Sequence, residues 1–248
     1  MPSLGSHLAS ARLVAGRLAN RTVDAERGSF YLGSTAPDIR VITRLDRAHY
    51  HFFDLDDMEH QDAVEQLFME HPGLREAVKL DEATRAFMAG YLTHLVMDQD
   101  YVERVYRAHF AADVWGDDPR GNVLDRVLQF EMDRREREGR EAMSEISEVL
   151  AHTSARADLG FIERQTLDRW LEVVRDIASQ PPDWSRFPRM MTRHLQRAGY
   201  SDEEIEQFCR DVPEILIETL DHVTEARVQE FLELTMDRAL QRLRDYLS

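Results

Sequence analysis

The sequence has a single cysteine, Cys209, among its 248 residues. An intramolecular disulfide is therefore excluded, and a reducing compartment is the simplest explanation of this cysteine usage. Cys209 itself is expected to be a packing residue. No apolar run approaches the roughly 18 to 20 residues that a membrane-spanning helix needs, so no transmembrane segment is predicted. The chain is long enough to bury a hydrophobic core without disulfides.

Basic residues are also few in comparison with acidic residues. The 31 Lys and Arg residues face 47 Asp and Glu residues, which gives a formal net charge of −16. Nucleic-acid partners and anionic membranes are disfavoured, because neutralising phosphate needs a surplus of basic side chains. The first 23 residues carry only positive charges, but Arg12 and Arg17 interrupt the apolar stretch that a signal peptide requires. We interpret this segment as a structured helix and predict a cytoplasmic protein.

Alternating apolar and polar runs bounded by turn dipeptides hardly appear, whereas helical periodicity extends over most of the chain. The sequence therefore predicts an all-α fold, a multi-helix bundle. A first helix is expected over about 3–19. Asp24 is the expected cap of a second helix, which should stop near Gly33, because a proline disfavours helix in the residue before it. The small residues at 33–38 are expected to form a loop.

The strongest helical pattern begins at Asp81. Apolar and polar side chains recur there at spacings of three and four, at Phe87, Tyr91, His94, Leu95, Asp98, Tyr101, Val102 and Val105. This helix is expected to be the spine of the fold. A shorter helix is expected before it, over 57–69, and a turn at 71–73 should separate the two.

Further helices are expected along the rest of the chain. A break at 115–121 should precede a helix from about 123, and the clearest corner lies at 180–184. Ser201 and Glu204 form a capping-box pattern, Pro213 should break the following stretch, and the last helix should end near Tyr246. We expect residues 1–150 to form a metal-binding helical core and residues 151–248 to form a C-terminal extension packed on the same domain. Trp170 is expected to be a core residue of that extension.

His94 and Asp98 are the first candidates for a chemical role. They lie four residues apart, so both side chains project from one face of the expected helix. Imidazole and carboxylate groups are suitable ligands for zinc or a similar divalent ion. The alternative is an ordinary hydrogen bond on a helix surface. The surrounding apolar sequence favours metal binding, because a buried charge is costly unless it is paired or coordinated.

Three further residues are weaker candidates when each is taken alone. Asp38 follows the small residues and Pro37, and it could be a plain turn aspartate. His51 could coordinate a metal or line the edge of a core, and His49 is a weaker alternative to it. His7, on the first helix, could be a capping or core histidine.

Taken together in this order, these pieces resemble the zinc-dependent phospholipase C family over residues 3 to 105. This family includes the catalytic domain of clostridial alpha-toxin and is related to the S1/P1 nucleases. The resemblance implies an all-helical bundle of the phospholipase C/P1 nuclease type. It also implies that Asp38, His51, His94 and Asp98 bind one metal, and that His7 binds a second metal bridged by Asp98. The expected cofactor is zinc, as one or two ions, with iron or another divalent metal as the alternative.

The sequence also departs from that family. Secreted members use the amino group of an N-terminal tryptophan, whereas this chain starts with Met1 and Pro2. Another metal of the family needs a histidine ten residues after the position of His94, where this chain has Arg104. Glu131 matches a glutamate of an expected HxxxE pair, but Val127 occupies the histidine position. The three-metal cluster of the family is therefore expected to be reduced to one site or two.

The resemblance predicts a metal-dependent phosphoric ester hydrolase that acts on a small phosphoester or a lipid head group. Asp38 would serve as a ligand or as the catalytic base that orients the attacking water. Because the protein is acidic, local positive charge from Arg40 or Arg104 would have to assist an anionic substrate. Two alternatives remain: a non-catalytic protein in which the ion is a structural clip, and a helical interaction module whose histidines are incidental. The sequence does not specify the oligomeric state.

Overall fold

The computed structural model describes residues 1–116, 118–181, 184, 187–197 and 199–248. Helices make up most of these ranges, and no strand occurs within them. The predicted all-α class is confirmed, and the specific phospholipase C/P1 nuclease type stays a prediction. None of the described helices combines the length and the apolar composition that crossing a bilayer would require.

The N-terminal helix α1 spans Leu4–Leu18, close to the expected range. The Ser3 hydroxyl caps it by accepting a hydrogen bond from the backbone N–H of Ser6. Two short helices follow, α2 over Arg21–Ala25 and α3 over Arg27–Gly33. The expectation that Asp24 caps the second helix is wrong. The side chain of Asn20 caps α2 instead, and Asp24 lies inside that helix.

The segment expected to be a loop at 33–38 is partly helical. The 3₁₀-helix η1 covers Ala36–Ile39, and α4 (Arg40–Thr43) and α5 (Ala48–His51) follow it. Pro37 is compatible with η1 because it lies in the first turn, where a helix leaves backbone N–H groups without intrahelical partners. The proline therefore opens this helical turn as well as following the end of α3.

The helix predicted for 57–69 begins later than expected. α6 spans Ala63–Glu70, and the carboxylate of Asp62 caps its first turn. Residues 52–62 form an irregular segment with an exposed acidic stretch. The 3₁₀-helices η2 (Pro72–Leu74) and η3 (Ala77–Lys79) then lead to the spine.

The predicted spine is confirmed as helix α7, Glu82–Tyr101, with Asp81 as its N-cap. It is buried along almost its whole length and continues into a π-helical segment, η4, over Val102–Tyr106. Helix α3 packs on one side of α7 and α16 on another. This burial explains why apolar residues surround the two polar candidates His94 and Asp98.

The remaining helices are α8 (Arg107–His109), α9 (Ala112–Trp115), α10 (Arg120–Glu136), α11 (Arg140–Ala151), α12 (Arg164–Ser179), α13 (Phe187–Arg197), α14 (Asp202–Arg210), α15 (Val212–His222) and α16 (Glu225–Leu247). The capping box of Ser201 and Glu204 is present, and Pro213 lies in the first turn of α15. Helix α10 starts three residues before the expected position. Part of the expected breaks, at 117 and 182–183, lies outside the described residues.

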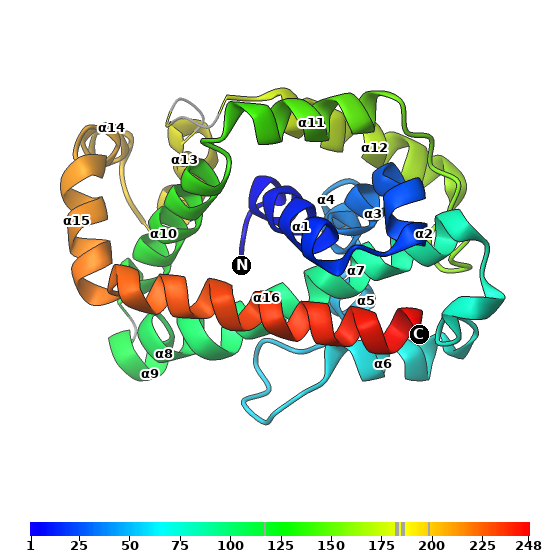
Figure 1. Cartoon of the computed structure of the whole chain (residues 1–248). Helices are drawn as coiled ribbons and strands as arrows, with labels where there is room; N and C mark the ends of the chain where they lie inside the picture. Colours follow the sequence, from blue (N-terminus) through cyan, green and yellow to red (C-terminus); the bar gives the residue numbers. More distant parts are fainter. Residues whose placement is uncertain (117, 182–183, 185–186, 198) are drawn as a thin grey trace.

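The buried apolar side chains form two clusters. The larger cluster joins α1, α3, α7, α11, α12 and the last turns of α16, and the smaller one joins α10, α13, α14, α15 and the beginning of α16. Helix α16 extends from the α15 side of the molecule to α6 and lies against α7 and α1 (Figure 1). Trp170 of α12 is completely buried, as expected for a core residue. The proposed boundary between residues 150 and 151 stays a prediction.

Candidate metal centre

The five residues singled out in the sequence come from four separate segments and meet inside the bundle. His94 and Asp98 lie one turn apart on α7, His51 ends α5, His7 belongs to α1, and Asp38 belongs to η1. The four residues other than Asp38 are at most 1% exposed, and the Asp38 side chain is 21% exposed. Asp38 is therefore the member of the group that faces outward.

The ligand atoms of the group lie at distances that suit a bound ion. Nε2 of His51 is 3.4 Å from Nε2 of His94, 3.2 Å from Oδ2 of Asp98 and 3.6 Å from Oδ1 of Asp38. Nε2 of His94 is 3.5 Å from Oδ2 of Asp98. In a tetrahedral zinc site with bonds of about 2.0 to 2.2 Å, neighbouring ligand atoms are about 3.3 to 3.6 Å apart. These residues could therefore hold a metal ion.

His7 approaches the other oxygen of the same carboxylate. Its Nε2 is 3.3 Å from Oδ1 of Asp98, and both atoms are buried without a hydrogen-bond partner. The ring of His7 also stacks on the ring of His94, with centroids 3.7 Å apart. The ligand atoms of His7, His94 and Asp98 lie within 4.8 Å of one another, as do those of Asp38, His51 and His94. Because orphaned buried polar atoms are costly, a cation beside Asp98 would satisfy both of them.

Backbone carbonyl groups orient two of the imidazoles. Nδ1 of His94 is 2.8 Å from the carbonyl oxygen of Ser34, and Nδ1 of His51 is 3.3 Å from that of Arg47. In the neutral rings, an Nδ1–H that donates to a carbonyl leaves the Nε2 lone pair toward the centre. Metal-binding histidines generally have such an outer partner for the second ring nitrogen.

The carbonyl of Ser34 reaches His94 because α3 and α7 cross with their backbones in close contact. A Cβ atom added to Gly90 would lie 2.0 Å from the carbonyl oxygen of Phe30, and one added to Gly33 would lie 2.0 Å from that of Phe87. Only glycine fits at these two positions. Gly33 thus allows the close backbone packing of α3 on α7.

The electrostatics of the centre favour the cation-binding forms of the two carboxylates and of His7. Burial opposes the charged form of Asp98, but His94 and the other two imidazoles outweigh it and hold the pKa of Asp98 well below its usual value. Burial alone would lower the pKa of His94, yet the charge of Asp98 raises it. Burial and His94 lower the pKa of His7 to about 4. Burial also opposes ionisation of Asp38, but its contact with His51 and the nearby His94 lower its pKa. At neutral pH both carboxylates are anionic and His7 is neutral.

The sequence interpretation missed one buried member of the centre, Arg47. Its Nη2 is 3.0 Å from Oδ2 of Asp98, and its guanidinium group stacks on the ring of Phe53 at 4.2 Å. Burial lowers the pKa of Arg47. The spacing of four residues between Arg47 and His51 could have indicated this position, because such residues share a helix face.

The residues at the family's other ligand positions, Arg104, Glu131 and Val127, make contacts outside the candidate ligand group. Arg104 does not face the centre, because its Nε is 3.7 Å from Oδ1 of Asp100, on the side of α7 that packs against α16. Glu131 is paired with Arg134 and Arg135. Val127 is a buried residue of the smaller apolar cluster. The expectation that Arg104 supplies positive charge to the centre is therefore wrong, whereas Arg40 lines a cavity together with Asp38.

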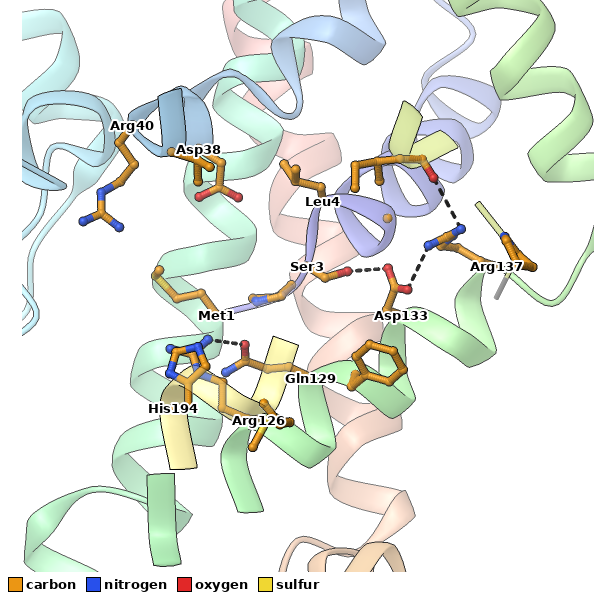
Figure 2. A pocket seen from close by; sticks show the side chains of 17 residues that line it. Met1, Ser3, Leu4, Asp38, Arg40, Arg126, Gln129, Asp133, Arg137 and His194 are labelled. Atoms are coloured by element: carbon orange, nitrogen blue, oxygen red, sulfur yellow. Dashed lines mark hydrogen bonds and ion pairs between the residues drawn. The ribbon is translucent and has the colours of Figure 1, made fainter. Parts of the chain in front are cut away.

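A cavity of about 410 Å³ adjoins the centre at Asp38. Figure 2 shows Asp38 and Arg40 on one wall, the N-terminal segment beside them, and Arg126 and Gln129 of α10 on the opposite wall. Asp38 belongs both to the ligand group and to the lining of this cavity. A small molecule in the cavity would therefore meet the centre through Asp38.

Comparison of the chain with protein-family models, with curated proteins and with solved structures gives no match. The geometry of the centre and of the cavity beside it is therefore the basis for assigning a function.

Proposed function

We propose that this protein is a zinc-dependent phosphoric ester hydrolase of the phospholipase C type. The observation that supports the proposal most strongly is the contact of His51 with His94 and Asp98 at 3.4 and 3.2 Å, in a buried centre that meets a cavity at Asp38. Two imidazoles and one carboxylate, here His51, His94 and Asp98, form a ligand set that zinc accepts readily, and three protein ligands would leave a position for water. When bound there, the ion would supply Lewis acidity and a lowered pKa for a coordinated water.

The residues of the chain would divide the remaining work. His94, His51 and Asp98 are held by the helices and by backbone carbonyls, so they fix the position of the centre. Asp38 is the one partly exposed carboxylate, and it would orient the attacking water and accept its proton at a carboxylate oxygen. His7 would contact the second carboxylate oxygen of Asp98, Oδ1, from the side of α1.

The test is metal content together with hydrolysis of bis-p-nitrophenyl phosphate and p-nitrophenyl phosphate. Protein produced with added zinc should contain about one equivalent of metal or more and should lose activity with a chelator and regain it with zinc. Asp98→Asn should lose most of the metal. Asp100→Asn is the matched control, because Asp100 is buried on the same helix but binds Thr235 and Arg238. Less than about a tenth of an equivalent of metal in the parent would count against the proposal.

A second candidate function, a structural clip, is favoured by how completely the centre is enclosed. Four of its five residues are at most 1% exposed, and closed sites are typical of structural zinc. The clip would join α1, η1, α5 and α7. It predicts a large fall of the melting temperature for His94→Ala and for Asp98→Ala, with no phosphoesterase activity in the zinc-loaded parent.

A further inference from the structure

Arg47 brings a fixed positive charge into the metal centre. Its side chain is 10% exposed, and its Nη2 lies 3.0 Å from Oδ2 of Asp98. Its Nη1 donates a hydrogen bond to the carbonyl oxygen of Phe53, at 3.4 Å. A guanidinium group stays protonated in proteins, so this charge is permanent.

The charges of the centre suit a single divalent ion. Asp38 and Asp98 contribute two negative charges and Arg47 contributes one positive charge, so the centre has one net negative charge when its imidazoles are neutral. One divalent ion would reverse the sign of this charge. A second would add two more positive charges beside Asp98, which is 1% exposed. Like charges repel strongly where little water screens them.

The ligand atoms of the centre form two groups that share His94. One group contains His51 and the other contains His7. Nδ1 of His94 lies 2.8 Å from the carbonyl oxygen of Ser34, so only its Nε2 offers a lone pair to a metal. An ion held by His51 and His94 would therefore leave the second group with His7 and Oδ1 of Asp98. These two ligands are buried, their atoms are 3.3 Å apart, and both atoms are without a hydrogen-bond partner.

We infer that His7 and Oδ1 of Asp98 form a latent second metal site, and that the charge of Arg47 limits the centre to one ion. The guanidinium group beside Oδ2 of Asp98 supplies the positive charge that a second ion would otherwise bring. Arg47 is therefore the residue that determines how many ions the centre holds. The inference rests on metal binding as in the proposed function, and it adds the number of ions and the residue that sets it.

The experiment titrates the metal-free full chain with zinc by calorimetry, followed by metal analysis of the dialysed protein. The parent should bind one equivalent, and Arg47→Met, which removes the charge but keeps an unbranched side chain, should bind two. Adding His7→Asn to Arg47→Met should return the number to one, and Arg47→Lys, which keeps the charge, should also bind one. Circular dichroism verifies that each variant is folded. Arg104→Met is the matched control, because Arg104 pairs with Asp100 outside the centre, and it should bind one equivalent.

Three results would overturn the inference. The first is a parent that binds two equivalents and loses one in His7→Asn, a comparison that does not depend on the folding of any Arg47 variant. The second is a folded Arg47→Met protein that still binds one equivalent. The third is a second equivalent in Arg104→Met, since overall charge would then explain the gain.

The outcome for the proposed function is separate. One equivalent in the parent and two in Arg47→Met, without hydrolysis of any phosphoester, would support the inference and refute the proposed function. A parent that hydrolyses phosphoesters with two bound ions would do the reverse.

Discussion

The close crossing of α3 and α7 can be tested with a single methyl group. In Gly90→Ala the added Cβ would lie 2.0 Å from the carbonyl oxygen of Phe30 and 2.8 Å from the backbone nitrogen of Ser34. Both neighbours are backbone atoms, so no side-chain rotation relieves the contact. Helix α3 must move away from α7, and the carbonyl of Ser34 must move away from His94.

The expected cost follows from two opposing effects. Overpacking of a well-packed core costs about 1 to 3 kcal/mol, and a backbone obstacle places this case near the upper end. Replacing glycine by alanine inside a helix returns about 1 kcal/mol. The net loss of about 2 kcal/mol should lower the melting temperature by roughly 4 to 8 °C in a chain of this length.

Thermal unfolding followed by circular dichroism measures this loss, and competition with a chromogenic chelator measures zinc affinity. Because the Ser34 carbonyl orients His94, affinity should fall by about tenfold or more. Gly16→Ala is the control: Gly16 lies in α1 with no atom within 4 Å of an added Cβ, so this variant should be slightly stabilised. A Gly90→Ala protein as stable as Gly16→Ala would refute the reasoning.

Three further predictions concern other parts of the chain. Arg47→Met removes the buried cation beside Asp98, so it should destabilise the metal-free protein by about 3 kcal/mol, and zinc should raise the melting temperature more in the variant than in the parent. Burial raises the pKa of Glu136 to about 7, so the folded state binds the proton more tightly, and stability should decrease as the pH rises from about 4.5 to 7. Glu136→Gln should therefore be more stable than the parent at pH 8, by at most ~3 kcal/mol, with a smaller difference in melts at pH 5. Ser201→Ala, which removes the capping box with Glu204, should cost about 1 kcal/mol in urea unfolding.

The sequence predicted the long helices better than the short ones. The spine at Glu82–Tyr101 was predictable because Asp81 is a strong cap and the apolar spacing continues over many turns. The start of α6 was not, because several acidic residues precede it and each could serve as a cap; Asp62, rather than Asp57, provides the hydrogen bonds. Local propensity does not distinguish such neighbours, since tertiary packing selects among them.

The ligand group was predictable as a set of residue types, but its surroundings were not. His94 and Asp98 share a face by helical geometry alone, and the structure brings His51 and Asp38 to them. Arg47 was not identified because arginine is seldom buried and because the sequence alone does not show which residues lie close together in space. Arg104 was misplaced for the same reason, since its partner Asp100 lies four residues earlier on the side of α7 that faces α16.

One hydrogen bond links the segment beside the centre to a residue that lies far away in the sequence. The indole N–H of Trp170 donates to the hydroxyl of Thr35, 3.2 Å away and 135 residues earlier in the sequence. Thr35 is three residues before Asp38 and directly follows Ser34, whose carbonyl binds His94. Helix α12 contributes none of the five candidate residues, yet it stabilises the peptide segment that orients His94 and leads to Asp38. Substitutions in α12 should accordingly reduce the amount of zinc that the protein retains. Zinc retention would then indicate whether α12 is packed against the segment that contains Thr35.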